Sequence, residues 1–266
     1  MTSAYSANNA AAYERYMGRW SRRLAPLLID FAGLDDANYV LDVGSGTGSL
    51  TFALREALPN ARIKGLDYSP AFVAYTSSKA HDDGNMAFEQ GDAASLPYED
   101  EAFDAALSLL VLNFVPDAQK AASELTRVTR QGGTVAACVW DFKGGFTWLR
   151  MFADTVAALL PSGDAFRARV FSGPFTGPGE FSAAWTNMKL RSVEQISLTV
   201  RIEFDSFADY WEPMLGGQGT AGAYVASLNN DERALIGHQL KLAYCAGDSD
   251  GPRSFAATAW ACRGTR

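Results

Sequence analysis

The sequence predicts an α/β fold with a doubly wound, mostly parallel β-sheet that is covered by helices on both faces. Between residues 39 and 141, short apolar runs alternate with helical patterns, as in consecutive βαβ units. Glycine-containing turns follow several of these runs, and two more strand-like runs lie near the C-terminus. We therefore expect seven strands in a Rossmann-like arrangement, with the last strand antiparallel and a helical, aromatic cap added to the sheet.

The five strands expected first are residues 40–43, 61–66, 86–90, 105–110 and 134–140. A helix over 50–58 carries its apolar residues on one face and stops at Pro59, and a second helix begins at Pro70 and runs to about residue 80. Asp117 is expected to cap a third helix, which should end at Gly132 and Gly133. Each helix therefore connects two neighbouring parallel strands.

The pattern changes beyond residue 141, where aromatic residues become more frequent. Residues 192–204 alternate as an edge strand does, and residues 254–262 can be its antiparallel partner. Between them, residues 207–246 look helical, with a glycine-rich interruption at 216–219. We expect three parts: an N-terminal helical lid (1–38), a core (39–141), and the end of the sheet with an inserted cap (142–266).

Composition excludes several classes of protein. Lys and Arg number 23 against 30 Asp and Glu, a net charge of −7 that gives no dense basic surface for nucleic acid. Hydrophobic residues make up 48% of the 266, enough for a sizeable core. The N-terminus has no signal-peptide pattern and no apolar run is long enough to span a bilayer. We expect a soluble, cytoplasmic protein with neither a nucleic-acid nor a membrane partner.

The cysteines and histidines do not form a metal or disulfide pattern. Cys138, Cys245 and Cys262 are far apart, as are His81 and His238. We therefore expect no metal site.

The most informative motif is Val-Leu-Asp-Val-Gly-Ser-Gly-Thr-Gly at residues 40–48. Glycines directly after the first strand allow a ligand to approach the backbone at the carboxyl edge of the sheet. Ser49 stands where the fingerprint for a dinucleotide pyrophosphate has its third glycine. This spacing disfavours an NAD(P)-dependent oxidoreductase, which we keep as an alternative.

Acidic residues end the next two strands. Asp67 follows the glycines by about 20 residues, and a carboxylate there can accept hydrogen bonds from both ribose hydroxyls. Tyr68 can lie against an adenine ring, and Asp92, after the third strand, can accept from the adenine amino group. The ends of successive parallel strands meet at one edge of a sheet, so the pattern predicts an adenosine site.

These segments resemble the class I S-adenosylmethionine-dependent methyltransferases. The resemblance rests on residues 40–48, 65–70, 91–97, 103–106 and 124–128, and is nearest to the small-molecule branch that includes the C-methyltransferases of ubiquinone and menaquinone biosynthesis. It implies S-adenosylmethionine as the cofactor and S-adenosylhomocysteine as the product. The residues that it places around the cofactor are Asp42, Gly44, Ser45, Gly46, Gly48, Asp67, Tyr68, Asp92, Ala93, Ser108 and Leu109.

Within that resemblance, the glycine loop packs on the methionine part, Asp67 binds ribose, and Asp92 with the N–H of Ala93 reads adenine. Ser108 and Leu109 line the sulfonium, and the charge of Asp42 favours this cation.

Two further segments bear on the acceptor and the lid. Residues 112–116 read Leu-Asn-Phe-Val-Pro, without the paired prolines of amino-group methyltransferases that act on DNA, so Asn113 and Phe114 are expected to line the pocket of a small substrate or simply to pack. Residues 13–20 resemble a lid that closes over the cofactor. A regular helix there places Tyr13, Tyr16 and Trp20 on one face, with Tyr16 against the cofactor.

We therefore expect methyl transfer to a small, partly apolar acceptor by in-line displacement. No catalytic residue is assigned, because a nucleophile that arrives as its anion needs no general base. A nonenzymatic S-adenosylmethionine-binding sensor or partner subunit is the second alternative. The identity of the acceptor, the atom that is methylated and the oligomeric state stay open.

Overall fold

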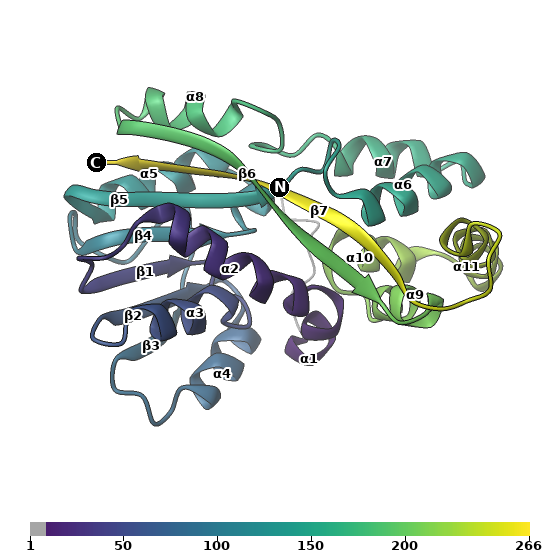
Figure 1. Ribbon diagram of the computed structural model, residues 1–266, viewed down its shortest axis with the longest axis horizontal. Helices are drawn as coiled ribbons and strands as arrows, with labels where there is room; N and C mark the ends of the chain where they lie inside the picture. Colours follow the sequence, from purple (N-terminus) through teal and green to yellow (C-terminus); the bar gives the residue numbers. More distant parts are fainter. Residues whose placement is uncertain (1–8) are drawn as a thin grey trace.

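The computed structural model describes residues 9–266, and its centre is one seven-stranded sheet in the order β3-β2-β1-β4-β5-β7-β6 (Figure 1). All neighbouring strands are parallel except where β7 pairs antiparallel with β5 and β6. The expected fold class is confirmed. The strands are β1 (Tyr39–Val43), β2 (Arg62–Asp67), β3 (Met86–Gln90), β4 (Phe103–Leu109), β5 (Thr129–Trp140), β6 (Arg191–Phe204) and β7 (Arg253–Thr265).

Two hydrophobic clusters cover the two faces of the sheet. On one face, α2 (Arg19–Ala32) and α3 (Ser49–Ala57) pack with Leu24, Leu28 and Leu54, all fully buried. On the other face, α5 (Ala118–Val128) and α8 (Glu180–Asn187) contribute Leu125 and Trp185. β4 runs between these layers with almost every residue buried, as expected of a central parallel strand.

The cap is built by helices beyond the sheet and by the long ends of β6 and β7, which extend out to it (Figure 1). Its helices share the larger hydrophobic cluster with α2 and α3. They are α6 (Thr147–Leu159), α7 (Gly163–Val170), α9 (Phe207–Leu215), α10 (Gly219–Ser227) and α11 (Asn230–Cys245).

The third expected helix ends earlier than the glycines suggested. Asp117 caps α5 as expected, accepting from the N–H of Lys120 at 2.9 Å, but the helix stops at Val128. Gly132 and Gly133 lie inside β5. A Cβ on Gly133 would stand 2.4 Å from the carbonyl oxygen of Asp104, so this glycine permits close approach of two strands and is not a helix stop.

The N-terminal segment is not one regular helix. A short helix α1 (Ala10–Tyr13) continues into a π-helical turn, η1 (Glu14–Gly18), before α2 begins. The rings of Tyr13, Tyr16 and Trp20 consequently meet three different partners: Phe72, Trp148 and Phe204, respectively. The π-helical turn takes an extra residue, so these side chains do not follow the spacing of the regular helix that the sequence predicted. Tyr16 and Trp20 still belong to one hydrophobic cluster, and Tyr13 packs against it. Residues 1–8 of the expected lid lie outside the described residues.

Some aromatic residues of the 142–211 segment lie away from the cap. Phe175, Phe181 and Trp185 form one cluster with α5 on the opposite face of the sheet, with Phe175 and Phe181 stacked at 4.6 Å. Within residues 9–266, no helix is long and apolar enough to cross a membrane. The three cysteines are free, and no group of three His, Cys, Asp or Glu side chains in the same range can hold a metal ion.

Candidate active site

A cavity of about 680 Å³ opens at the carboxyl ends of β1, β2, β3 and β4. This is the edge where the sequence placed the adenosine site. The lining includes ten of the expected residues: Asp42, Gly44, Ser45, Gly46, Asp67, Tyr68, Asp92, Ala93, Leu109 and Phe114. Tyr13, Thr47, Ser69, Leu110 and Val111 also line it, and of these the sequence reasoning did not select Ser69 or Val111.

The glycine loop folds tightly over the end of β2. The N–H groups of Gly44 and Ser45 both donate to the carbonyl of Leu66, at 2.7 and 3.0 Å. Gly44 has φ of +80°, and a Cβ on it would collide with Val111 at 2.4 Å. The loop therefore needs glycine here for its backbone conformation and for space.

Gly48 and Ser108 do not line this cavity. A Cβ on Gly48 would lie 2.3 Å from Phe52 and 3.2 Å from Thr76, so Gly48 allows α3 to pack closely on its neighbours. Ser108 is fully buried, and its hydroxyl donates to the carbonyl of Val43 at 2.8 Å. Gly48 and Ser108 therefore contribute to the packing and hydrogen bonding that hold the cavity wall in place.

Asp67 holds the glycine loop in place. One carboxylate oxygen accepts from the N–H of Gly46 and the other from the N–H of Ser69, each at 2.8 Å. The side chain is only 9% exposed, so burial raises its pKa, while the two backbone donors act in the opposite direction. The carboxylate is buried because the glycine loop folds over it. Each oxygen has a further lone pair available for a ligand hydroxyl.

Asp42 lies fully buried beneath the same loop and lines the cavity. Its Oδ2 accepts from the hydroxyl of Thr51 at 2.6 Å, whereas Oδ1 has no hydrogen-bond partner among residues 9–266. Burial raises its pKa to about 7, and the nearby Asp67 adds to this rise. A buried carboxylate with a free oxygen is suited to pair with a cationic ligand group.

The part of the cavity beside Tyr68 and Asp92 is more open. Tyr68 is 77% exposed, so its ring is available to lie against a planar ligand. Asp92 is exposed and accepts from the N–H of Ala94 at 2.8 Å, while Ala93 is buried.

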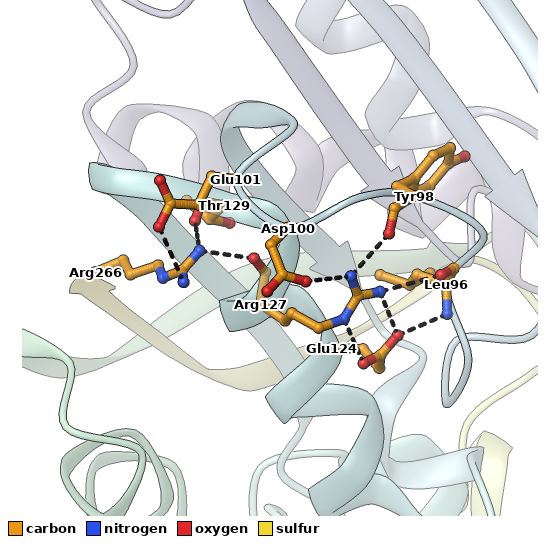
Figure 2. Close-up of polar contacts among 8 residues, drawn as sticks. All are labelled: Leu96, Tyr98, Asp100, Glu101, Glu124, Arg127, Thr129 and Arg266. Carbon is orange, nitrogen blue, oxygen red and sulfur yellow. Dashed lines mark hydrogen bonds and ion pairs between the residues drawn. The ribbon is translucent and has the colours of Figure 1, made fainter.

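Helix α5 anchors the loop that follows Asp92, as Figure 2 shows. Glu124 accepts from the N–H of Leu96 at 2.8 Å, and Arg127 donates to the carbonyls of Leu96 and Tyr98 at 3.1 and 2.7 Å. Arg127 also pairs with Asp100 and with Glu124, both at 2.8 Å, which lowers the pKa of Glu124. The segment at 124–128 therefore fixes the loop at its far end.

A second cavity, of about 480 Å³, adjoins the first. The two cavities share Tyr13, Leu110, Phe114 and Pro116 as lining residues. The rest of the second lining is mostly apolar and aromatic, and comes from the lid, the end of β5 and the cap: Tyr16, Met17, Trp140, Phe142, Phe146, Leu149, Val170 and Ala221. A compartment of this size and character fits a small organic molecule.

The expected site residues of the N-terminal segment and of the segment after β4 are distributed over both cavities. Tyr16, which was expected against the cofactor, lines only the second cavity, whereas Tyr13 lines both. Asn113 lines the second cavity, and its Oδ1 is buried with no hydrogen-bond partner in the described chain. Phe114 lies between the two cavities. The sequence predicted that the segment containing Tyr13 lies over the cofactor site, but only the structure shows which of its side chains line each cavity.

Neither histidine lines either of these two cavities. His81 is exposed and pairs with Asp82 at 3.0 Å, and His238 is exposed on α11.

Comparison with known proteins identifies relatives of this arrangement. A family model described as a methyltransferase domain matches residues 41–137. An uncharacterized protein of Mycobacterium tuberculosis is 30% identical over 218 residues, which cover 80% of this chain and 78% of the relative. A demethylmenaquinone methyltransferase of Thermus thermophilus is 36% identical over 116 residues, or 43% of this chain and 51% of that protein.

Among solved structures, a phosphoethanolamine N-methyltransferase of Haemonchus contortus in complex with S-adenosyl-L-methionine superposes with a TM-score of 0.59. The identity is 16%, and the match covers 96% of this chain and 56% of the other. At this identity the likeness shows a common fold.

Proposed function

Because the chain belongs to the class I S-adenosylmethionine-dependent methyltransferases, with S-adenosylmethionine as its cofactor, we propose that it methylates a small, partly apolar acceptor. The observation that carries this proposal is the pair of adjoining cavities with Phe114, Leu110 and Tyr13 in their common wall. A methyltransferase must bring a donor and an acceptor into contact, and two compartments that share a wall supply that geometry.

The residues around the larger cavity fit the cofactor. Asp42 presents a buried carboxylate oxygen without a partner, as the positively charged end of S-adenosylmethionine requires. Asp67 has lone pairs for the ribose hydroxyls, and Asp92 with the N–H of Ala93 is assigned to adenine. The exposed ring of Tyr68 would cover the base. When bound, the cofactor supplies a methyl group already activated on a sulfonium.

The contribution of the protein is then alignment and the exclusion of water. An acceptor atom must approach the methyl carbon within about 3–3.5 Å and in line with the bond that breaks. Phe114 and Tyr13, which lie between the compartments, would hold it there. Asn113 would orient it by accepting a hydrogen bond from a hydroxyl or amino group of the acceptor, because its buried Oδ1 has no other donor in residues 9–266.

A nonenzymatic sensor would need the first cavity but not the second, and the aromatic lining of the second cavity therefore favours an enzyme. The free cysteines support a reducing, cytoplasmic environment.

Thermal scans test the cofactor site. At a ligand concentration 100-fold above the dissociation constant, S-adenosylmethionine or S-adenosylhomocysteine should stabilise the protein by about 2.7 kcal/mol, with a much smaller effect of NAD. Turnover is then measured as formation of S-adenosylhomocysteine across a library of small hydroxyl, amine, thiol and carbon acceptors. An equal rise of the unfolding temperature with NAD would contradict the assignment of the larger cavity to S-adenosylmethionine. Binding of S-adenosylmethionine without turnover across the library would favour the nonenzymatic sensor.

A further inference from the structure

The second cavity contains an unusual concentration of unpaired donors. Arg169, in the last turn of α7, lines the cavity and is exposed. Its guanidinium lies 5.9 Å from the ring of Phe166, and no carboxylate in residues 9–266 forms an ion pair with it. Most other arginines near the cap have acidic partners, for example Arg167 with Asp154 at 3.5 Å. An arginine left without an acid at the edge of an apolar cavity can receive an anionic ligand group.

A buried N–H accompanies this charge. Trp140 lines the same cavity and is 2% exposed, with its ring stacked on Phe146 at 4.6 Å. Its Nε1 donor is buried and has no acceptor within the described chain. A buried donor without an acceptor costs about 1–3 kcal/mol, so a ligand oxygen that accepts from it would recover this energy.

The third donor group is the start of α10. Gly219, Thr220 and Ala221, its first turn, line the cavity, and the first N–H groups of a helix have no partner within the helix. The preceding residue, Gln218, is 4% exposed and does not cap the helix: its amide accepts from the N–H of Asn9 and donates to the carbonyl of Gly216. The positive end of the helix dipole therefore lies at the wall of the cavity.

One carboxylate lines the cavity as well, at the solvent-exposed start of α5. Asp117 also lines the second cavity, but its Oδ1 accepts from the N–H of Lys120 as the cap of α5. The donors come from α7, α10 and the end of β5, whereas Asp117 and Asn113 come from the segment that follows β4. The donors on α7, α10 and β5 therefore favour an anionic part of a ligand, whereas Asp117 and Asn113 favour a part that donates hydrogen bonds.

From these contacts we infer that the methyl acceptor is an apolar, planar molecule that carries a carboxylate, bound by Arg169 with the N–H groups of Trp140 and α10. This inference rests on the proposed function, since it specifies the substrate class of the same site. The aromatic walls bind the ring system. The anionic group holds the molecule by one end and leaves its other end for the shared wall with the cofactor cavity.

The test uses the full-length protein saturated with S-adenosylhomocysteine and two matched probes, 2-naphthoate and the uncharged 2-naphthamide. Calorimetric titration at pH 7 should show about tenfold tighter binding of 2-naphthoate. Arg169→Gln should reduce the affinity for 2-naphthoate to that for the amide and leave the amide unchanged, whereas Arg169→Lys should retain part of the preference. Arg167→Gln, an exposed arginine two residues away that lines neither cavity, is the control and should change nothing.

Equal affinity of the wild-type protein for the two probes, an unaltered preference in Arg169→Gln, or binding of neither probe would each overturn the inference. Binding of S-adenosylhomocysteine is measured first in every variant. If it is retained while the preference for the acid is absent, the inference fails and the proposed methyltransfer stands; if the wild-type protein does not bind it, the proposed function fails.

Discussion

Replacing Asp42 by Asn should stabilise the cofactor-free protein at neutral pH and weaken its binding of S-adenosylmethionine. Asp42 is fully buried, and this burial raises its pKa to about 7, far above the value near 3.9 of an aspartate in an unfolded chain. Asparagine can still accept the hydrogen bond that Thr51 donates, but it does not titrate. The substitution therefore isolates the effect of the buried charge.

The sign follows from the two pKa values. Because the folded-state pKa is the higher one, the folded protein holds the Asp42 proton between about pH 4 and pH 7, whereas the unfolded chain releases it. The stability contributed by protonated Asp42 is complete below about pH 4 and is lost as the pH rises through 7. At 1.36 kcal/mol for each pH unit, the loss is about 4 kcal/mol, which the Asn variant avoids.

Denaturant unfolding of both proteins at pH 4.5, 5.5, 6.5 and 7.5 measures this difference, since titrating groups other than the neighbouring Asp67 contribute equally to the two. The Asn variant should gain on the wild-type protein as the pH rises, by up to about 4 kcal/mol. Calorimetry should show wild-type affinity for S-adenosylmethionine rising almost tenfold per pH unit below about pH 7, with little pH dependence in the variant. Parallel stability curves would refute the assignment of a raised pKa to the buried Asp42.

Asp67→Ala should cost on the order of 2 kcal/mol of cofactor binding, measured by calorimetry, and should also lower the midpoint of thermal unfolding, because the N–H groups of Gly46 and Ser69 lose their acceptor. An unchanged affinity would exclude the ribose role. Asp92→Ala should weaken binding less and leave the unfolding midpoint unaltered, since this side chain is exposed. Phe114→Ala should lower turnover and acceptor affinity, by less than the 1.5–3 kcal/mol of a fully buried ring, in steady-state kinetics with an identified acceptor; normal values for both would assign Phe114 to packing.

The sheet and the cofactor edge were predictable because their signals are local. The apolar runs that form β1 to β3 end at or directly before a glycine or an acid, and the chain order of parallel strands places those ends at one edge. Asp117 was recognised as a helix cap from its own sequence position for the same reason. A prediction from neighbouring residues holds where the conformation, as at a strand end or a helix cap, depends on those residues alone.

Glycines show where such reasoning fails. Gly133 looks like a helix stop in the sequence, yet its role depends on the carbonyl of Asp104 in a neighbouring strand. The three glycines at 44, 46 and 48 look equivalent, but Gly44 faces Val111, Gly46 donates to Asp67, and Gly48 gives space to Phe52. The sequence indicates that a small residue is needed, whereas only the tertiary structure shows what occupies the space.

The acceptor side depends almost entirely on such distant contacts. Arg169, Trp140 and the start of α10 come from separate parts of the chain, and no spacing relates them. Only after the cap has folded onto the sheet do these donors line one cavity. A cofactor common to many enzymes can be recognised by a motif at strand ends, while an acceptor particular to one enzyme is bound by whatever groups its cap brings together. For this reason the unpaired donors of the second cavity carry more information about the substrate than any motif in the sequence does.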